Sequence, residues 1–158
     1  ERKGPHRLLE AARGLENVGL LFIGSGNIEL EGEEVAFKGV LPHEQLPEIL
    51  SAADIYALPT LSEGSCNSIV EALHCGLPVV SSDGEFNDDL LNDDVSIRVD
   101  PGNIVQIRDA IALLQADIRM RSRMAKAALK RAQDLTLEKR AKDIYGWLEE
   151  ICRNYKRS

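Results

Sequence analysis

The sequence predicts an α/β fold: a doubly wound parallel sheet followed by a helical C-terminal tail. Over the first two thirds of the 158 residues, short continuous apolar runs alternate with longer amphipathic segments. Strands that are apolar on both faces and separated by helices form parallel sheets with helices on both sides. In the last third, apolar residues recur at helical spacing alone. We therefore expect one domain, with its α/β part in residues 1–115 and its C-terminal helices in residues 116–158.

Each predicted strand is short and ends where glycine, proline or polar residues interrupt the apolar run. The strands are expected over residues 18–23, 35–37, 54–58, 79–81 and 95–99. The helices between them are expected over residues 6–13, 44–53 and 68–75, and another is expected to start at Asn87-Asp88-Asp89. Pro5 suits the first position of the first helix, and Gly76 with Pro78 ends the third.

Two apolar stripes predict the helices of the tail. The first stripe consists of Ile104, Ile107, Ile111 and Leu114. The second stripe consists of Leu137, Ala141, Ile144, Leu148, Ile151 and Tyr155, and we expect it to be partly uncovered.

The composition excludes several classes of function. With 19 Lys and Arg against 26 Asp and Glu, the formal charge is −7, which disfavours nucleic acid or an anionic membrane as a partner. No apolar run approaches the roughly 18 residues of a membrane span. The three cysteines form no Cys-x-x-Cys pair, which favours a reduced, cytoplasmic setting.

Several common ligand motifs are incomplete or missing. Gly24-Ser-Gly26 begins a dinucleotide-binding pattern, but Glu29 stands where the third glycine belongs. The sequence has neither a P-loop nor the Gly-x-Ser-x-Gly of serine hydrolases. Its three histidines have no metal-ligand spacing to any cysteine, and it has no Asp-x-Asp. We therefore expect no metal site and no cofactor.

The most informative segment runs from Leu58 to Val80 and is predicted as strand, tight loop, helix, turn and strand. Glu63 lies in the loop and Glu71 lies one turn inside the helix, with seven residues between them. The backbone N–H groups of Gly64–Asn67 and the positive end of the helix suit an anion such as a diphosphate. A neighbouring carboxylate can accept hydrogen bonds from sugar or ribose hydroxyls. Ligands of such sheets bind at this edge, where the strands have their carboxyl ends.

A structural interpretation of the same segment stays open. Ser68-Ile-Val-Glu71 is also a capping box, in which Ser68 caps the helix and Glu71 reaches back to it. Cys66 lies beside the start of the helix, and we expect it to be buried and unreactive.

The segment resembles the E-x7-E region of retaining glycosyltransferases of the GT-B fold, the group 1 or family 4 class. The matching positions are Pro59, Glu63, Gly64, Glu71, Ala72, Gly76, Pro78, Val79 and Val80. Lys3-Gly4, Phe22-Ile-Gly24-Ser-Gly26, Val35-Ala-Phe-Lys-Gly39 and Ala53-Asp54 look like further motifs of the family, so the resemblance covers nearly the whole chain. It implies the Rossmann-like C-terminal half of such an enzyme, which binds the nucleotide-sugar donor.

The resemblance implies a role for each matching residue. Glu63 holds hydroxyls of the donor sugar near the reacting centre, Lys3 neutralises the leaving diphosphate, and Glu71 binds the ribose hydroxyls. The phosphates and the base meet backbone groups of Gly64, Ser65, Cys66, Asn67, Ser68 and Leu41. Lys38 and His43 are further candidates near the base.

The implied activity is retaining, metal-independent transfer of a sugar from a nucleoside-diphosphate sugar to an acceptor hydroxyl. A separate N-terminal domain, absent here, would bind the acceptor, a glycan or a lipid-linked sugar. We expect this fragment alone to be inactive and the full-length enzyme to be cytoplasmic, at the inner face of the membrane.

Two departures from the family pattern leave other functions open. The family's diphosphate arginine would precede residue 1, and Glu63-Gly-Ser-Cys66 replaces the common Glu-Gly-x-Gly. The alternatives are a nucleotide-sugar epimerase or phosphorylase relative with the same sheet, and a non-catalytic interaction or signalling module.

Overall fold

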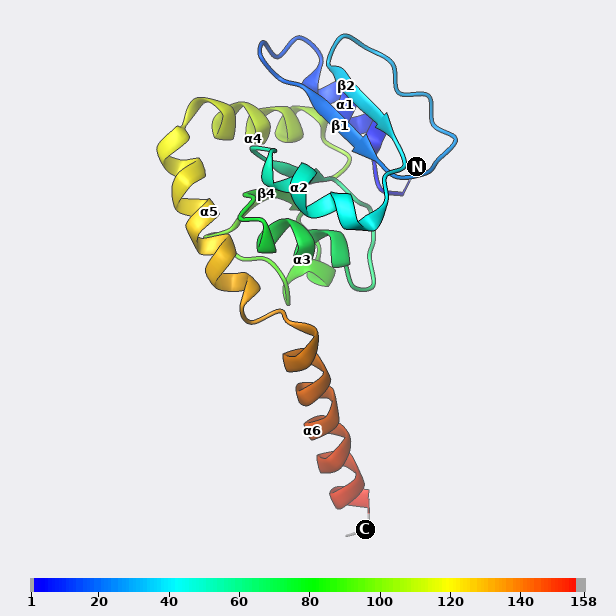
Figure 1. Cartoon of the computed structure of the whole chain (residues 1–158), viewed down its shortest axis with the longest axis vertical. Helices are drawn as coiled ribbons and strands as arrows, with labels where there is room; N and C mark the ends of the chain where they lie inside the picture. Colours follow the sequence, from blue (N-terminus) through cyan, green and yellow to red (C-terminus); the bar gives the residue numbers. More distant parts are fainter. Residues whose placement is uncertain (1, 156–158) are drawn as a thin grey trace.

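The computed structural model describes residues 2–155. Parallel strands and helices are interspersed over the first two thirds of the described chain, and three helices follow the last strand, of which the final one is the longest (Figure 1). In chain order the elements are α1 (Pro5–Ala12), β1 (Leu20–Ile23), β2 (Val35–Gly39), a 3₁₀ turn (His43–Gln45), α2 (Leu46–Ser51), β3 (Tyr56–Leu58), α3 (Asn67–His74), β4 (Val79–Ser82), a 3₁₀ turn (Glu85–Asn87), β5 (Ser96–Val99), α4 (Ile104–Ala116), α5 (Ile118–Ala132) and α6 (Leu137–Tyr155).

Every strand pair is parallel, which confirms the predicted class of fold. The order β3-β4-β5 forms one sheet, and β1-β2 forms another, with no hydrogen-bonded pair between the two among the described residues. One apolar cluster nevertheless joins them, because Leu8 of α1 and Val80 of β4 pack with Phe22 of β1.

Strand β4 shows why the sheet needs helices on both faces. Its four residues are all buried, and successive side chains of a strand point to opposite faces. Val79 packs into the cluster that contains Ile69 and Leu73 of α3, while Val80 packs with Leu114 of α4. The central sheet is therefore covered on both sides, as the sequence predicted.

The other sheet departs from the expectation of strands apolar on both faces. Strand β2 alternates between half-buried and exposed positions. In β1 three residues are half-buried and Leu21 is 46% exposed, so neither strand has a fully buried residue. Strand β1 begins at Leu20, two residues later than expected. The predicted helix over residues 44–53 is also divided: Pro47 lies in the first turn of α2, after the 3₁₀ turn.

The expected helix start at Asn87-Asp88-Asp89 is wrong. Asn87 instead ends a 3₁₀ turn, and its side chain is fully buried. Its Nδ2 donates to the Ser82 carbonyl at 2.9 Å and lies 3.3 Å from Ser81 Oγ. These bonds to the end of β4 hold the segment against the strand, where it cannot continue as a helix.

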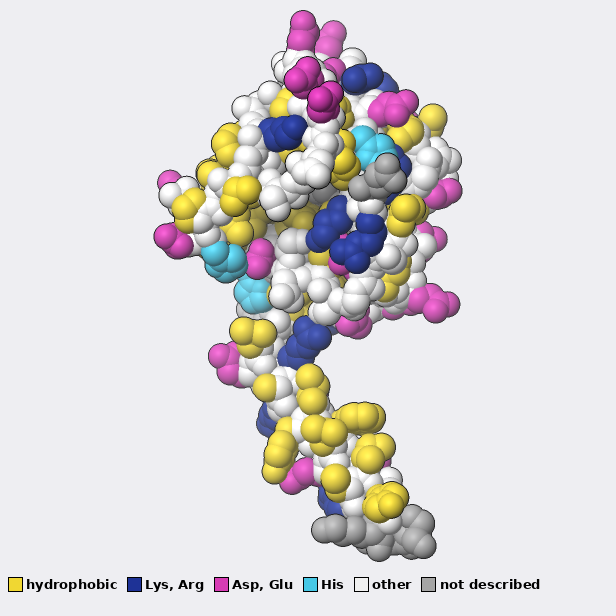
Figure 2. Space-filling model, turned by 90° about the vertical axis from the view of Figure 1, so that its right-hand side faces the viewer, with side chains coloured by type: hydrophobic (Ala, Val, Ile, Leu, Met, Phe, Trp, Pro, Cys, Tyr) yellow, Lys and Arg dark blue, Asp and Glu magenta, His cyan; other side chains and the backbone are white. Residues whose placement is uncertain are grey.

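Helix α6 projects away from the α/β body (Figure 1). None of its residues is buried, and apolar side chains gather along it (Figure 2). The exposed apolar residues include Leu137, Ile144, Trp147, Leu148, Ile151 and Tyr155. The expectation that this stripe is uncovered is therefore confirmed. Within residues 2–155, no helix combines the length and the apolar character needed to cross a membrane.

Two adjacent leucines of α4 test the burial pattern. Leu114 is fully buried, whereas Leu113 is 48% exposed. Leu114→Ala should lower the free energy of unfolding by about 2–5 kcal/mol, because it leaves a cavity in the core. Leu113→Ala should lower it by less than about 1 kcal/mol. Urea-induced unfolding followed by circular dichroism measures both, and equal losses would contradict the described core.

Candidate functional site

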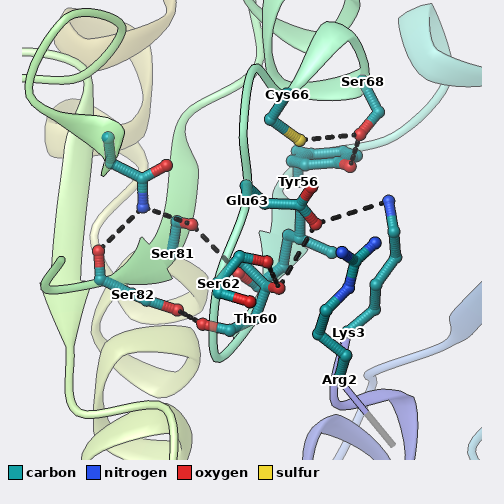
Figure 3. A network of polar contacts seen from close by, with 12 residues as sticks. Arg2, Lys3, Tyr56, Thr60, Ser62, Glu63, Cys66, Ser68, Ser81 and Ser82 are labelled. Atoms are coloured by element: carbon teal, nitrogen blue, oxygen red, sulfur yellow. Dashed lines mark hydrogen bonds and ion pairs between the residues drawn. The ribbon is translucent and has the colours of Figure 1, made fainter. Parts of the chain in front are cut away.

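The candidate site lies where β3 ends and the chain crosses to α3. Thr60, two residues after the end of this strand, is fully buried. Its carbonyl accepts a hydrogen bond from Ser82 Oγ at the end of β4. Its own hydroxyl lies 3.0 Å from the Ser62 carbonyl and 3.2 Å from Glu63 Oε1, so one proton is shared between the two acceptors (Figure 3). The neighbouring strand thus fixes the loop that carries Glu63.

The N-terminal segment is bound to the same loop. The Leu61 N–H donates to the Arg2 carbonyl at 3.0 Å, and Arg7 Nη2 donates to the Pro59 carbonyl at 2.8 Å. Gly4 has φ +68, and a Cβ there would lie 2.4 Å from the Pro59 carbonyl oxygen. Only glycine permits this approach without strain.

This approach brings Lys3 to Glu63. Lys3 Nζ lies 3.5 Å from Glu63 Oε1, and the side chains of Arg2 and Lys3 both extend toward the loop (Figure 3). The Glu63 side chain is only 8% exposed, whereas that of Lys3 is 53% exposed. A carboxylate with so little water needs a charged or hydrogen-bonding partner, and Lys3 and Thr60 both serve.

Glu71 lies in a different environment on α3. Its side chain is 37% exposed, and His43 Nε2, after β2, lies 3.3 Å from its Oε1. The two glutamates of the motif therefore differ: Glu63 is enclosed and paired with lysine, and Glu71 is open and paired with an exposed histidine. Leu41, which was expected near the base, is half-buried in the same connection as His43.

The capping-box interpretation of Ser68 and Glu71 is wrong. The helix is capped at Cys66, and Ser68 already lies within its first turn. Ser68 Oγ accepts from the Tyr56 hydroxyl at 2.7 Å and lies 3.2 Å from Cys66 Sγ. Ser68 therefore lies past the capping position and bonds to Tyr56 of β3, while Glu71 pairs with His43.

The loop over residues 64–67 has a polar surface and one buried side chain. Gly64, Ser65 and Asn67 are exposed, whereas Cys66 is 4% exposed and its Sγ lies 3.2 Å from Ser68 Oγ in the first turn of α3. Ser65 Oγ accepts a hydrogen bond of 2.9 Å from Arg140 Nη1 of α6. Lys38, the other candidate, donates instead to the Ile28 carbonyl at 2.9 Å.

Sequence reasoning missed Thr60, Tyr56 and Arg140 as residues of this site. Thr60 lies within the informative segment, and its place as the first polar residue after an apolar strand could have indicated it. Arg140 lies 75 residues from its partner and carries no motif. Among residues 2–155, no group of three or more His, Cys, Asp or Glu side chains is placed to hold a metal ion.

Tyr56 gives the site a testable pH dependence. Burial raises the pKa of its phenol above the ordinary value, and the hydrogen bond with Ser68 opposes this more weakly. Because the folded protein keeps a proton that the unfolded chain releases, this stabilisation is fully present below about pH 10 and falls as the pH rises further. Tyr56→Phe should lower the free energy of unfolding by about 0.5–1.5 kcal/mol at neutral pH and flatten its decline above about pH 10.

The exposed Tyr145 of α6 provides the matched control. Tyr145→Phe should leave both quantities unchanged in urea unfolding measured at pH values on either side of 10. A decline above this pH that is equally steep in wild type and Tyr56→Phe would show that the phenol is not the group responsible.

Comparisons with known proteins agree with this fold. The family model described as "Glycosyl transferases group 1" matches residues 1–131. The amylovoran biosynthesis glycosyltransferase AmsK of Erwinia amylovora is 32% identical over 133 residues, which cover 72% of this chain and 33% of that protein. The lipopolysaccharide core biosynthesis glycosyltransferase LpsE of Rhizobium meliloti is 29% identical over 134 residues, which cover 79% of this chain and 39% of that protein.

Solved structures show the same fold. Sucrose-phosphate synthase from Thermosynechococcus elongatus superposes with a TM-score of 0.82 at 23% identity, over 97% of this chain and 43% of that chain. Anabaena HepE in complex with UDP-glucose superposes with a TM-score of 0.80 at 23% identity, over 94% of this chain and 46% of that chain.

The chain spans between a fifth and two fifths of the length of AmsK, LpsE and TuaC, the teichuronic acid glycosyltransferase of Bacillus subtilis. The match of the family model extends through both sheets and through helices α1 to α4. The chain therefore belongs to the glycosyl transferases group 1 family.

Proposed function

We propose that this chain is the donor-binding part of a retaining, metal-independent glycosyltransferase. The enzyme transfers a sugar from a nucleoside-diphosphate sugar to an acceptor hydroxyl. One observation carries the proposal. The loop after β3 holds the enclosed Glu63 beside Lys3, and Glu71, which is open to solvent, lies one turn inside α3. The two carboxylates have different surroundings, which suits them to two parts of one donor.

In this proposal Glu63 and Lys3 act at the reacting end. Glu63 accepts hydrogen bonds from hydroxyls of the donor sugar. Lys3, whose side chain is half exposed, faces the leaving diphosphate as its negative charge grows. A fixed positive charge and preorganised N–H dipoles stabilise such a transition state. The acceptor hydroxyl attacks from the face of the departing phosphate, which takes its proton, so the anomeric configuration is retained.

Glu71 and the loop bind the nucleotide end. Glu71 accepts from the ribose hydroxyls, and its pairing with His43 holds the carboxylate in place. Backbone N–H groups of residues 64–68 meet the phosphates at the positive end of α3. The base lies against the backbone at Leu41. The UDP-glucose bound by Anabaena HepE, which has the same fold, supports a nucleoside-diphosphate sugar as the donor.

The acceptor and the setting follow from the relatives. AmsK and LpsE are named for amylovoran and lipopolysaccharide core biosynthesis. We propose a growing glycan or a lipid-linked sugar as the acceptor, bound by another part of the enzyme. The reaction would take place in the cytoplasm, at the inner face of the membrane, with no cofactor.

Kinetics of the full-length enzyme test the role of Glu63. Glu63→Gln keeps the shape of the side chain and removes its charge, and it should lower kcat on the order of 10²-fold. Glu48→Gln, on the exposed surface of α2, is the matched control and should change nothing. Proton NMR of the product should show the anomeric configuration of the donor, and chelators should not reduce the rate.

Other results would favour the rival functions. Conversion of the donor without any acceptor would indicate an epimerase. A full-length protein that binds no donor and turns over none would indicate an interaction module. An unchanged kcat in Glu63→Gln would remove Glu63 from the reacting centre.

A further inference from the structure

Helix α6 reaches the donor loop through one side chain. Arg140 lies near the start of α6, and its Nη1 donates to Ser65 Oγ at 2.9 Å. Ser65 lies between Glu63 and the first turn of α3, in the middle of the loop proposed to meet the phosphates.

The local structure directs Arg140 toward the loop. The Arg140 N–H donates to the Thr136 carbonyl at 3.0 Å, and Thr136 Oγ1 accepts from the Lys139 N–H at 3.2 Å. Lys139 also pairs with Asp134, whose pKa is lowered by this contact. The first turn of α6 is thus fixed to the connection that precedes it, which sets where Arg140 lies although none of the helix is buried.

We propose that Arg140 is a positioning residue of the donor site: its hydrogen bond to Ser65 holds the loop over residues 64–67 in the conformation that binds the diphosphate. The inference rests on the proposed function. Gly64 and Ser65 are exposed, and a Cβ at Gly64 would meet no atom within 4 Å, so packing alone does not fix this part of the loop. The side-chain bond from α6 supplies a constraint that the loop's own packing lacks.

A consequence is that donor binding is coupled to the position of α6 in which Arg140 bonds to Ser65. A change that displaces the start of α6 removes the bond to Ser65 and loosens the loop. A donor that needs the ordered loop in turn favours the seated helix, because coupling between two sites is reciprocal.

The test uses titration calorimetry on the full-length enzyme with UDP, GDP and ADP. Arg140→Ala should weaken the affinity for the nucleoside diphosphate that binds by about three- to ten-fold, which is the net contribution of one ordinary hydrogen bond between exposed groups. Ser65→Ala should lower this affinity by the same factor, and the double variant should bind the nucleotide no more weakly than either single variant does. The parent nucleoside, which has no phosphate, should bind all variants alike.

Lys142→Ala is the matched control, since it removes one positive charge from an exposed position of the same helix. It should bind as wild type does. Arg140→Ala should raise the KM for the donor with kcat nearly unchanged, and its thermal unfolding midpoint should equal that of wild type. A general loss of structure would instead lower the midpoint and affect the nucleoside as well.

The outcomes separate this inference from the proposed function. If wild type and Arg140→Ala bind a nucleoside diphosphate with equal affinity, the inference about Arg140 is overturned and the proposed function is not. Additive losses in the double variant overturn it too, because Arg140 would then act without Ser65. If wild type binds none of the three nucleoside diphosphates, the proposed function fails, and the inference fails with it.

Discussion

The site depends on one constraint: the Glu63 carboxylate is almost enclosed and must keep its partners. Water reaches little of this side chain, so the Thr60 hydroxyl and the Lys3 ammonium take its place. Lys3 reaches it because Gly4 lets the N-terminal segment lie against the Pro59 carbonyl. Segments that lie about 60 residues apart in the chain are joined there, and α1 and the end of β3 are positioned together. The Glu63 carboxylate is thus held in place by this chain's own groups before any ligand binds, and such preorganisation is the condition for electrostatic stabilisation of a transition state.

Glu71, the second glutamate, lies in a different environment. Glu71 lies on the open side of α3 and shares its carboxylate with His43, an exposed residue of the connection after β2. A carboxylate with access to solvent can exchange water for ribose hydroxyls with little loss of solvation, whereas Glu63 is already desolvated. The pairing of His43 with Glu71 also links the connection after β2 to α3, the helix between β3 and β4 of the other sheet. The candidate site therefore combines elements of both sheets, and the apolar cluster that joins them holds its two halves in register.

Much of the fold could be predicted from the sequence because its signals are local. The continuous apolar run of β4 and the alternation of strands with helices define a covered parallel sheet, and Pro5 and Gly76 mark helix ends. The predicted capping box is wrong because the Ser68 hydroxyl can bond either to the backbone of its own helix or to Tyr56. Only the packing of Tyr56 against α3 decides between these two partners. The helix start predicted at Asn87 is wrong for a similar reason: the buried side-chain amide of Asn87 bonds to β4, and no local sequence pattern encodes that contact. The two glutamates are predicted as site residues because the whole segment around them resembles the family's E-x7-E region. Thr60, His43 as the partner of Glu71, and Arg140 depend on tertiary contacts.

The central claim is that the two glutamates and the loop between them bind a nucleotide donor. Calorimetric titration of the full-length enzyme with UDP, GDP and ADP, in wild type and Glu71→Ala, tests it most directly, with Glu48→Ala as the control. We expect one nucleoside diphosphate to bind and Glu71→Ala to weaken its binding by about ten-fold or more, because a carboxylate that accepts hydrogen bonds from the ribose hydroxyls is lost. Equal affinity of wild type and Glu71→Ala for that nucleotide would contradict the account.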